Sequence, residues 1–176
     1  MATPIWVATK TWATGDVPAA SDANAYWTSN LNHLASPAGV QVVRSTALSI
    51  SNSVASPFTP ITWSTPANWD TDTFLSGSRL TVPTGLGGRY FVSMWCEWAA
   101  NATGQRIIAL LKNGVLVFQA ANQIDTSSTY GVDMGHTDEI ALAAGDYVEM
   151  SVYQNVSPSA SLNITKARMT IRKVSN

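Results

Sequence analysis

The sequence is poor in charge and gives no basic surface by composition. Lysine and arginine total 10 of 176 residues, aspartate and glutamate total 11, and only 12% of the chain is charged, about half the usual share. The formal net charge of −1 argues against a nucleic-acid partner, because nucleic-acid binding needs a positive field. The shortage of glutamate and lysine also disfavours a helical bundle, which uses them on its exposed faces.

Cysteine and long apolar runs are scarce as well. Cys96 is the single cysteine, which excludes an intrachain disulfide and a multi-cysteine zinc site. No apolar run approaches the about 20 residues that cross a bilayer, so we expect no membrane insertion. Serine and threonine are abundant instead, and there are seven tryptophans. This composition indicates a neutral, β-rich protein whose length allows an ordinary core without covalent staples.

The first 39 residues differ from the rest of the chain. Residues 1–20 carry Trp6, Trp12, Gly15 and Asp16 without a steady period, and they predict an extended arm that ends in a turn.

Residues 21–34 predict one short helix, with Ser21 or Asp22 as its N-cap, and Asp22 also suits the positive end of the helix dipole. Apolar residues recur there at i, i+4, i+8 and i+11, which puts on one helix face Ala23, Trp27, Leu31 and Leu34.

This apolar helix face needs a partner surface. A helix of about fourteen residues is marginal alone in water, so its stripe must lie on something. It either packs on its own domain or, with the arm, forms a docking element for another protein. We accordingly divide the chain into an arm and helix, residues 1–39, and a second domain, residues 40–176.

From residue 40 onward the pattern is one of strands and turns. β-Branched and aromatic runs alternate with Gly, Pro, Ser and Asn clusters at roughly eight- to twelve-residue spacing, which predicts an all-β antiparallel jelly-roll sandwich of about ten strands. Asn113-Gly114 predicts a type I′ hairpin, and a change of parity predicts a bulge near Thr165–Lys166. The predicted strands are residues 41–44, 58–63, 78–82, 89–98, 106–112, 115–121, 129–136, 138–142, 147–153 and 162–174.

Three stretches of this region resemble a known group of trimeric jelly rolls. They are ITWSTPANWDTDTFLSGSRLTVPTGLGGRYFVSMWCEW, ALLKNGVLV and IALAAGDYVEMSVYQ. In this order they resemble the proteins related to tumour necrosis factor and the complement globular head. The resemblance spans about residues 40–174 and implies a homotrimer.

The N-terminal region resembles a different group. TWATGDVPAASDANAYWTSNLNHL is similar to an N-terminal segment of bacteriophage virion proteins, in which a Trp precedes a Gly-Asp or Gly-Glu pair and an Asn-Leu pair closes the helix. Ala23 departs from that pattern, which usually has Leu there. The matching residues are Trp12, Gly15, Asp16, Val17, Ser21, Asp22, Asn24, Asn30, Leu31 and Leu34.

Together the two resemblances imply a phage virion structural protein. The leading hypothesis is a trimeric capsid decoration, or cement, protein on the capsid exterior, bound to the major capsid protein or another virion protein. The alternative is a tail-fibre or baseplate tip that binds a host carbohydrate or receptor. A long stalk, a collagen-like repeat and coiled-coil heptads are all missing, which favours the head. The expected docking residues are Trp6, Trp12, Asp16, Asp22, Trp27, Leu31 and Leu34.

The tryptophan and tyrosine residues Tyr90, Trp95, Trp98, Tyr147 and Tyr153 admit two interpretations. They can stack sugars, or they can fill the core and the subunit interface, and the second is favoured. The predicted trimer interface contains Tyr90, Trp95, Tyr147 and Tyr153. Trp63 and Trp69 flank an aspartate-containing turn and are expected to be the most exposed of the tryptophans.

The sequence offers little for catalysis, and we expect no enzyme activity, no cofactor and no metal site. His33 has no carboxylate or cysteine at ligand spacing, and His136 shares a strand face only with Asp138, so we interpret it as part of a turn. No Gly-x-Ser-x-Gly nucleophile motif occurs. Cys96 is expected to be a buried apolar residue. The oxygens of Asn68, Asp70 and Asp72 are spaced as in a calcium loop, although a solvated turn is favoured.

Overall fold

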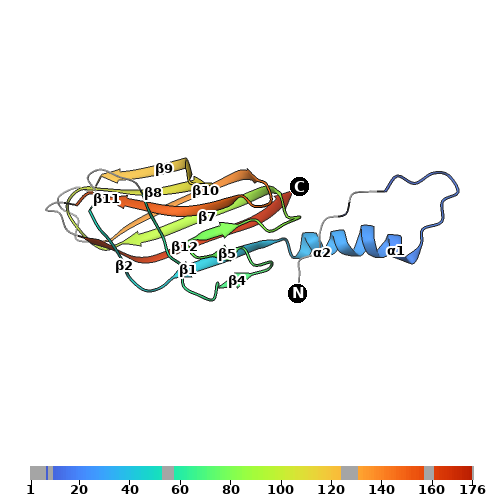
Figure 1. Ribbon diagram of the computed structural model, residues 1–176, viewed down its shortest axis with the longest axis horizontal. Coiled ribbons are helices and arrows are strands. Elements are labelled where there is room, and N and C mark those ends of the chain that lie inside the picture. The colour runs from blue at the N-terminus through green and yellow to red at the C-terminus, as the bar shows by residue number, and fades with distance from the viewer. Residues whose placement is uncertain (1–6, 8–9, 53–57, 124–130, 157–160, 176) are drawn as a thin grey trace.

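The computed structural model describes residues 7, 10–52, 58–123, 131–156 and 161–175 (Figure 1). Within these residues an N-terminal helical segment precedes twelve strands, which form two antiparallel sheets. The predicted all-β sandwich with a preceding arm and short helix is therefore confirmed. None of the described helices is long and apolar enough to cross a bilayer.

The helix projects from one end of the sandwich (Figure 1) and is built from three consecutive pieces. These are α1 (Ala20–Asp22), η1 (Ala23–Thr28) and α2 (Ser29–Ala35). The middle piece is a π-helical turn in which the Ser29 N–H donates to the Asn24 carbonyl. A π-helical turn of this kind adds one residue to the local repeat and often marks a functional position.

The structure corrects the predicted N-cap. Asp22 is the third residue of the helix, and its carboxylate accepts the Ala19 N–H at 3.1 Å. It therefore reaches backward, as the acidic member of a capping box does, and does not cap the first-turn amides. Its charge still lies at the positive end of the helix dipole.

The two sheets, called sheet A and sheet B here, face each other across the core. Sheet A contains β1 (Gly39–Arg44), β2 (Leu48–Ile50), β4 (Trp69–Asp70), β7 (Gly88–Trp98), β10 (Val132–Leu142) and β12 (Leu162–Ser175). Its strand order is β10-β7-β12-β1-β4, and β2 pairs with β12. Sheet B contains β3 (Thr59–Pro60), β5 (Leu75–Ser76), β6 (Arg79–Thr81), β8 (Gln105–Lys112), β9 (Val115–Gln123) and β11 (Tyr147–Gln154). Its order is β5-β6-β11-β8-β9, with β3 on β11.

Several local predictions are confirmed. The β8–β9 hairpin turns through Asn113 and Gly114, both at positive φ (52° and 77°), as a type I′ turn requires. The register of β12 against β7 shifts between Ile164 and Lys166, so the bulge lies where the parity change placed it.

Other strand predictions need correction. The predicted strands at residues 129–136 and 138–142 form one strand, β10, because Thr137 continues the ladder opposite Ser93; residues 129 and 130 lie outside the described residues. The short strands β2, β4 and β5 were not predicted. Two or three residues are too few to show an alternating pattern.

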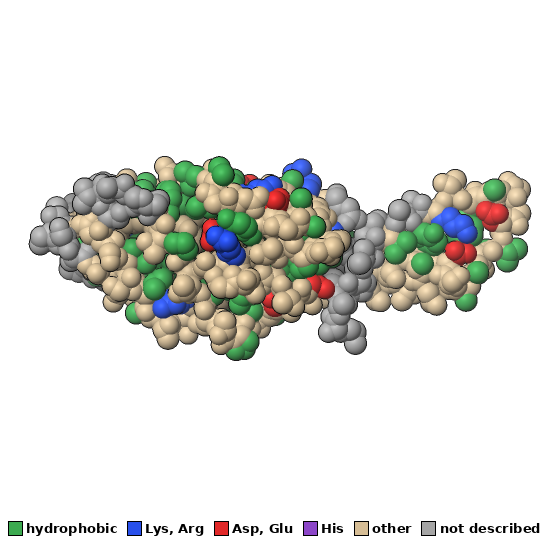
Figure 2. Space-filling model, viewed as in Figure 1, with side chains coloured by type: hydrophobic (Ala, Val, Ile, Leu, Met, Phe, Trp, Pro, Cys, Tyr) green, Lys and Arg blue, Asp and Glu red, His purple; other side chains and the backbone are tan. Residues whose placement is uncertain are grey.

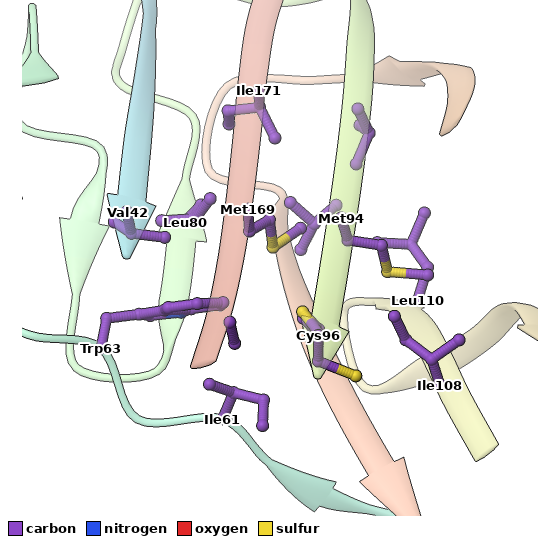
Figure 3. Close-up of a cluster of buried hydrophobic side chains, with 14 of the residues drawn as sticks. Val42, Ile61, Trp63, Leu80, Met94, Cys96, Ile108, Leu110, Met169 and Ile171 are labelled. Atoms are coloured by element: carbon purple, nitrogen blue, oxygen red, sulfur yellow. The ribbon is translucent and has the colours of Figure 1, made fainter. Parts of the chain in front are cut away.

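The core lies between the facing sheets (Figure 3). Met94 and Met169 of sheet A and Ile108 and Leu110 of sheet B are all buried and belong to one core cluster. Trp63, expected to be exposed, is buried in this core and donates its indole N–H to the Ser78 carbonyl at 3.3 Å. Its hydrogen-bond partner lies 15 residues further along the chain, and the core cluster that includes Trp63 draws on both sheets, so local sequence does not specify its burial.

A short link fixes where the helix leaves the sandwich. Helix α2 ends at Ala35 and β1 begins at Gly39. Ala38 is fully buried, and its carbonyl accepts the Lys173 N–H at 2.8 Å. A side chain at Gly39 would place its Cβ 2.4 Å from the Ile171 carbonyl oxygen, so only glycine lets β1 approach β12 this closely. The helix thus extends from a rigid base.

Candidate docking surface

The N-terminal arm folds back along the helix, and the side chain of Asn30 joins the two through a pair of hydrogen bonds. The Val7 N–H donates to Asn30 Oδ1 at 2.8 Å, and Asn30 Nδ2 donates to the Val7 carbonyl at 3.0 Å. Asn30 is 8% exposed, so both hydrogen bonds are shielded from water. We call residues 7 and 10–35 the arm–helix unit.

Further contacts shape the tip of this unit. Lys10 Nζ lies 3.5 Å from the Asp22 carboxylate and 4.3 Å from the centre of a Trp12 ring. Asp16 accepts the Ala13 N–H at 2.8 Å, and Gly15 has a φ of 95°, which confirms the predicted turn. The predicted docking residues Asp16 and Asp22 therefore have intramolecular roles that preorganise the unit.

The apolar stripe of the helix is largely exposed, and the described part of the sandwich does not cover it. Trp27, Leu31 and Leu34 are 64%, 65% and 67% exposed, and Trp12 is also exposed. Figure 2 shows hydrophobic side chains on the surface of this projecting unit. The stripe therefore does not pack on the protein's own sandwich. Of the other predicted members, Trp6 and the side chain of Ala23 lie outside what the structure describes.

The stripe offers apolar area and almost no free charge. The charged residues between positions 10 and 35 are Lys10, Asp16 and Asp22, and each is engaged within the unit. Two exposed leucines and two tryptophans would each contribute roughly 1.5–3 kcal/mol if fully buried. A partner that contacts this surface must therefore supply a complementary apolar surface.

The four predicted trimer-interface aromatics do not form one patch. Tyr90 is fully buried, and its hydroxyl donates to the Leu86 carbonyl at 2.5 Å. Burial, followed by the charge of Asp72, raises the pKa of Tyr90. Its ring is enclosed by its own sheets, so the prediction for Tyr90 is wrong.

The other three aromatic residues keep some exposure. Trp95 lies on the outer face of sheet A, whereas Tyr147 and Tyr153 alternate with buried β11 residues on the outer face of sheet B. Tyr147 lies 4.2 Å from the Arg79 guanidinium. For these residues the interface assignment stays a prediction.

Sheet A carries a depression on its outer face that sequence reasoning missed. Ser93, Trp95 and Arg168 line a volume of about 270 Å³. Gly135 of β10 lies opposite Trp95, and a Cβ there would sit 3.6 Å from Trp95 Cδ1. That distance is an ordinary van der Waals contact, so Gly135 and the indole lie next to each other on this face. Its lining comes from two strands that are far apart in sequence, so no local motif marks it.

The residues considered for catalysis are spread across the structure. His136 lies within β10, not in a turn, where its ring stacks on Phe118 with 4° between the ring planes. Its Nε2 is 3.7 Å from Asp138. The described residues contain no group of three His, Cys, Asp or Glu side chains arranged for a metal ion. The side chain of His33 lies outside the described residues.

Cys96 and the aspartate-containing turn have structural roles. Burial, followed by the charge of Asp133, raises the pKa of the Cys96 thiol to about 12, so the thiol is a weak nucleophile. The Asp70 carboxylate accepts the N–H groups of Phe74 and Leu75, both at 2.9 Å. These bonds hold a turn of the chain.

The fold defines the structural class. Two antiparallel sheets with the first and last long strands, β1 and β12, side by side form the jelly roll shared by tumour-necrosis-factor and complement globular domains. The solved structure of murine APRIL at pH 5.0 matches with a TM-score of 0.54 and 11% identity, over 78% of this chain and 99% of that chain. The globular domain of zebrafish complement 1qA protein matches with a TM-score of 0.55 and 13% identity, over 79% and 99%.

These similarities establish the fold of the sandwich and leave function open. Identities of 11% and 13% are too low to carry over activity or partners. No protein-family model and no curated protein sequence matches the chain. Function must therefore be argued from the surfaces described above.

Proposed function

We propose that this protein is a homotrimeric, non-catalytic bacteriophage virion protein that decorates the head shell. In this proposal the arm–helix unit binds the major capsid protein or another virion protein, and the jelly roll faces outward on the capsid exterior. Burying the helix stripe would link each trimer to the shell and stabilise the assembled particle by mass action.

One observation carries the proposal: the apolar face of the helix is exposed to solvent, while the arm holds the helix in a defined conformation. Trp27, Leu31 and Leu34 are all more than three-fifths exposed, and exposed contiguous apolar surface usually marks an interaction site. The phage-like pattern of residues 11–34 supports a virion partner, and the sandwich fold, found in trimeric proteins, supports a homotrimer.

The experiment compares full-length variants for binding to undecorated phage heads by co-sedimentation. Leu31→Asn/Leu34→Asn removes apolar contact from two exposed positions, so the isolated protein keeps its fold. If each leucine contributes about 2 kcal/mol to docking, affinity for heads falls roughly a thousandfold. Leu31→Met/Leu34→Met is the matched control, because it keeps both positions apolar and should bind as the original chain does.

The outcomes separate the head assignment from other roles. Saturable uptake on heads, lost in the asparagine variant and kept in the methionine variant, supports decoration. Equal uptake of all three proteins would show that the stripe does not dock. Uptake on host cells with none on heads would remove the decoration proposal altogether.

The depression beside Trp95 favours one alternative, a tail-tip protein that binds host carbohydrate. An indole next to the Arg168 guanidinium and the Ser93 hydroxyl offers stacking and hydrogen bonds to a sugar. Trp95→Ala should then abolish binding to host cells. If the variant still binds cells, or the original chain never does, this alternative fails.

A further inference from the structure

The turn between β8 and β9 contains the single asparagine of the chain that is followed by glycine, Asn113. Such a pair is chemically reactive, because glycine has no Cβ to shield its backbone nitrogen. That nitrogen can attack the neighbouring carboxamide and expel its amide group as ammonia. Asn113 and Gly114 are both exposed, so water reaches the site.

The carboxamide of Asn113 is bound on both sides by the start of β11 and the turn that precedes it. Its Nδ2 donates to Asp146 Oδ1 at 2.7 Å, and its Oδ1 accepts the Tyr147 N–H at 2.9 Å. The backbone N–H of Asn113 donates in turn to the Tyr147 carbonyl at 3.0 Å. We call the two side-chain hydrogen bonds the Asn113 clamp, and they join the β8–β9 turn to the β10–β11 turn.

Asp146, the acidic partner in this clamp, is held by further groups of its own. Its Oδ2 accepts the Ala143 N–H at 2.8 Å and lies 3.0 Å from Lys112 Nζ, which also donates to the Ala141 carbonyl at 2.8 Å. The hydrogen bond from Asn113 is the largest cause of the lowered pKa of Asp146. The acceptor is therefore an ionised carboxylate, and charge-assisted hydrogen bonds are roughly twice as strong as neutral ones.

The clamp lies at the end of the sandwich from which the helix projects. Leu142, the last residue of β10, is opposite Gly88, and a Cβ on Gly88 would lie 2.2 Å from the Ser175 carbonyl oxygen at the end of β12. Lys173 of the same strand donates its N–H to the carbonyl of Ala38, just before β1. A change in these turns therefore occurs near the base of the helix.

We propose that Asn113 is a deamidation site, that the Asn113 clamp sets its rate, and that its conversion uncouples the two turns. The Gly114 nitrogen loses its proton and bonds to Asn113 Cγ, the Cγ–Nδ2 bond breaks, and that nitrogen leaves as ammonia. Water then opens the cyclic imide at either carbonyl carbon, which gives aspartate or isoaspartate at position 113. The ring closes only after the carboxamide has left Asp146 and Tyr147, because both of its polar atoms are bound there.

The product cannot form the clamp again. Aspartate at position 113 has no Nδ2 donor, so its carboxylate would face Asp146 Oδ1 across the distance of 2.7 Å that the hydrogen bond now spans, and like charges this close disfavour each other. Isoaspartate also adds a carbon to the backbone, which a two-residue type I′ turn does not accommodate. Each converted chain therefore has a loosened pair of turns near the base of the helix.

The experiment follows conversion of Asn113 in full-length chains at mildly alkaline pH, by peptide mass mapping and by the ammonia released. Asp146→Ala removes the charged acceptor and should speed conversion at least about tenfold. Lys112→Ala is the matched control: it removes a neighbour of Asp146 and neither bond of the clamp, so the rate should stay within about twofold. Asp146→Asn keeps an uncharged acceptor oxygen and should also react faster than the original chain.

The rates are compared between variants that circular dichroism shows to be folded, and Asp146→Asn replaces Asp146→Ala if the latter is not. An Asp146 variant that reacts no faster than the original chain overturns the proposal, as does Lys112→Ala reacting as fast as that variant. An original chain that reacts equally fast when folded and in denaturant also overturns it.

The uncoupling of the turns has its own test. Asn113→Asp, which supplies one product directly, should lower the free energy of unfolding more at about pH 7 than at about pH 3, because the repulsion needs both carboxylates ionised. An equal loss at both pH values would overturn the uncoupling. These measurements use the isolated protein, so their outcome is independent of whether it binds phage heads.

Discussion

The side chain of Asn30 connects the arm to the helix, and replacing it gives a quantitative prediction. Asn30→Ala deletes two hydrogen bonds, to the N–H and the carbonyl of Val7. Each neutral bond contributes about 1 kcal/mol net, so closure of the arm loses about 2 kcal/mol. That loss corresponds to roughly thirtyfold more frequent local opening.

Hydrogen exchange measures this opening directly. The Val7 amide, protected in the original chain, should exchange about thirtyfold faster in Asn30→Ala, while amides of β7 and β12 keep their rates because the sandwich is a separate layer of structure. Asn32→Ala is the matched control: it makes the same substitution two residues away on an exposed helix position.

The reasoning fails under a specific result. If Asn30→Ala and Asn32→Ala accelerate Val7 exchange equally, the clamp contributes nothing and the change reflects helix propensity alone. If Val7 exchanges at the unprotected rate in the original chain, the arm is not held on the helix in solution.

Three further predictions concern the sandwich. Met94→Ala creates a cavity at a buried position and should lower the free energy of unfolding by about 2–5 kcal/mol, measured in denaturant; a loss below 1 kcal/mol would contradict the packing described. Cys96, with its pKa raised to about 12, should resist maleimide at pH 8 in the native protein and react promptly once unfolded, and rapid native labelling would argue against its burial. Hydrogen bonds from Asn113, then from the Ala143 backbone and Lys112, lower the pKa of Asp146 from 3.8 to about 2, so its stabilisation is present above about pH 4 and lost as pH falls toward 2. The stability difference between the original chain and Asp146→Asn should shrink over that window; a difference constant from pH 5 to 2 would refute it.

Local sequence signals were sufficient to predict much of the secondary structure. A type I′ turn requires positive φ at two consecutive residues, and Asn113 and Gly114 adopt it readily, so two positions suffice to predict the hairpin. The parity change after Ile164 located the bulge for a similar reason, since strand alternation is a local property. Even so, the strand break expected at Thr137 does not exist, because the ladder with β7 continues through it.

Only part of the candidate docking surface could be predicted from the sequence. The helical spacing of Trp27, Leu31 and Leu34 placed them on one face, and the absence of any covering surface was left open. The clamp between Val7 and Asn30 spans 23 positions, and no periodic pattern connects a side chain to a distant backbone group.

Sequence alone determined the all-β class, the short helix with its apolar stripe, and the main turns, because these follow from alternation, turn chemistry and composition within a few residues. Tertiary structure decided which aromatic residues are inside. Trp63 and Tyr90 are buried in a core cluster built from segments far apart in the chain, while Trp95 stays at the surface beside Gly135. Burial of this kind depends on contacts between segments far apart in the chain, which local sequence does not specify.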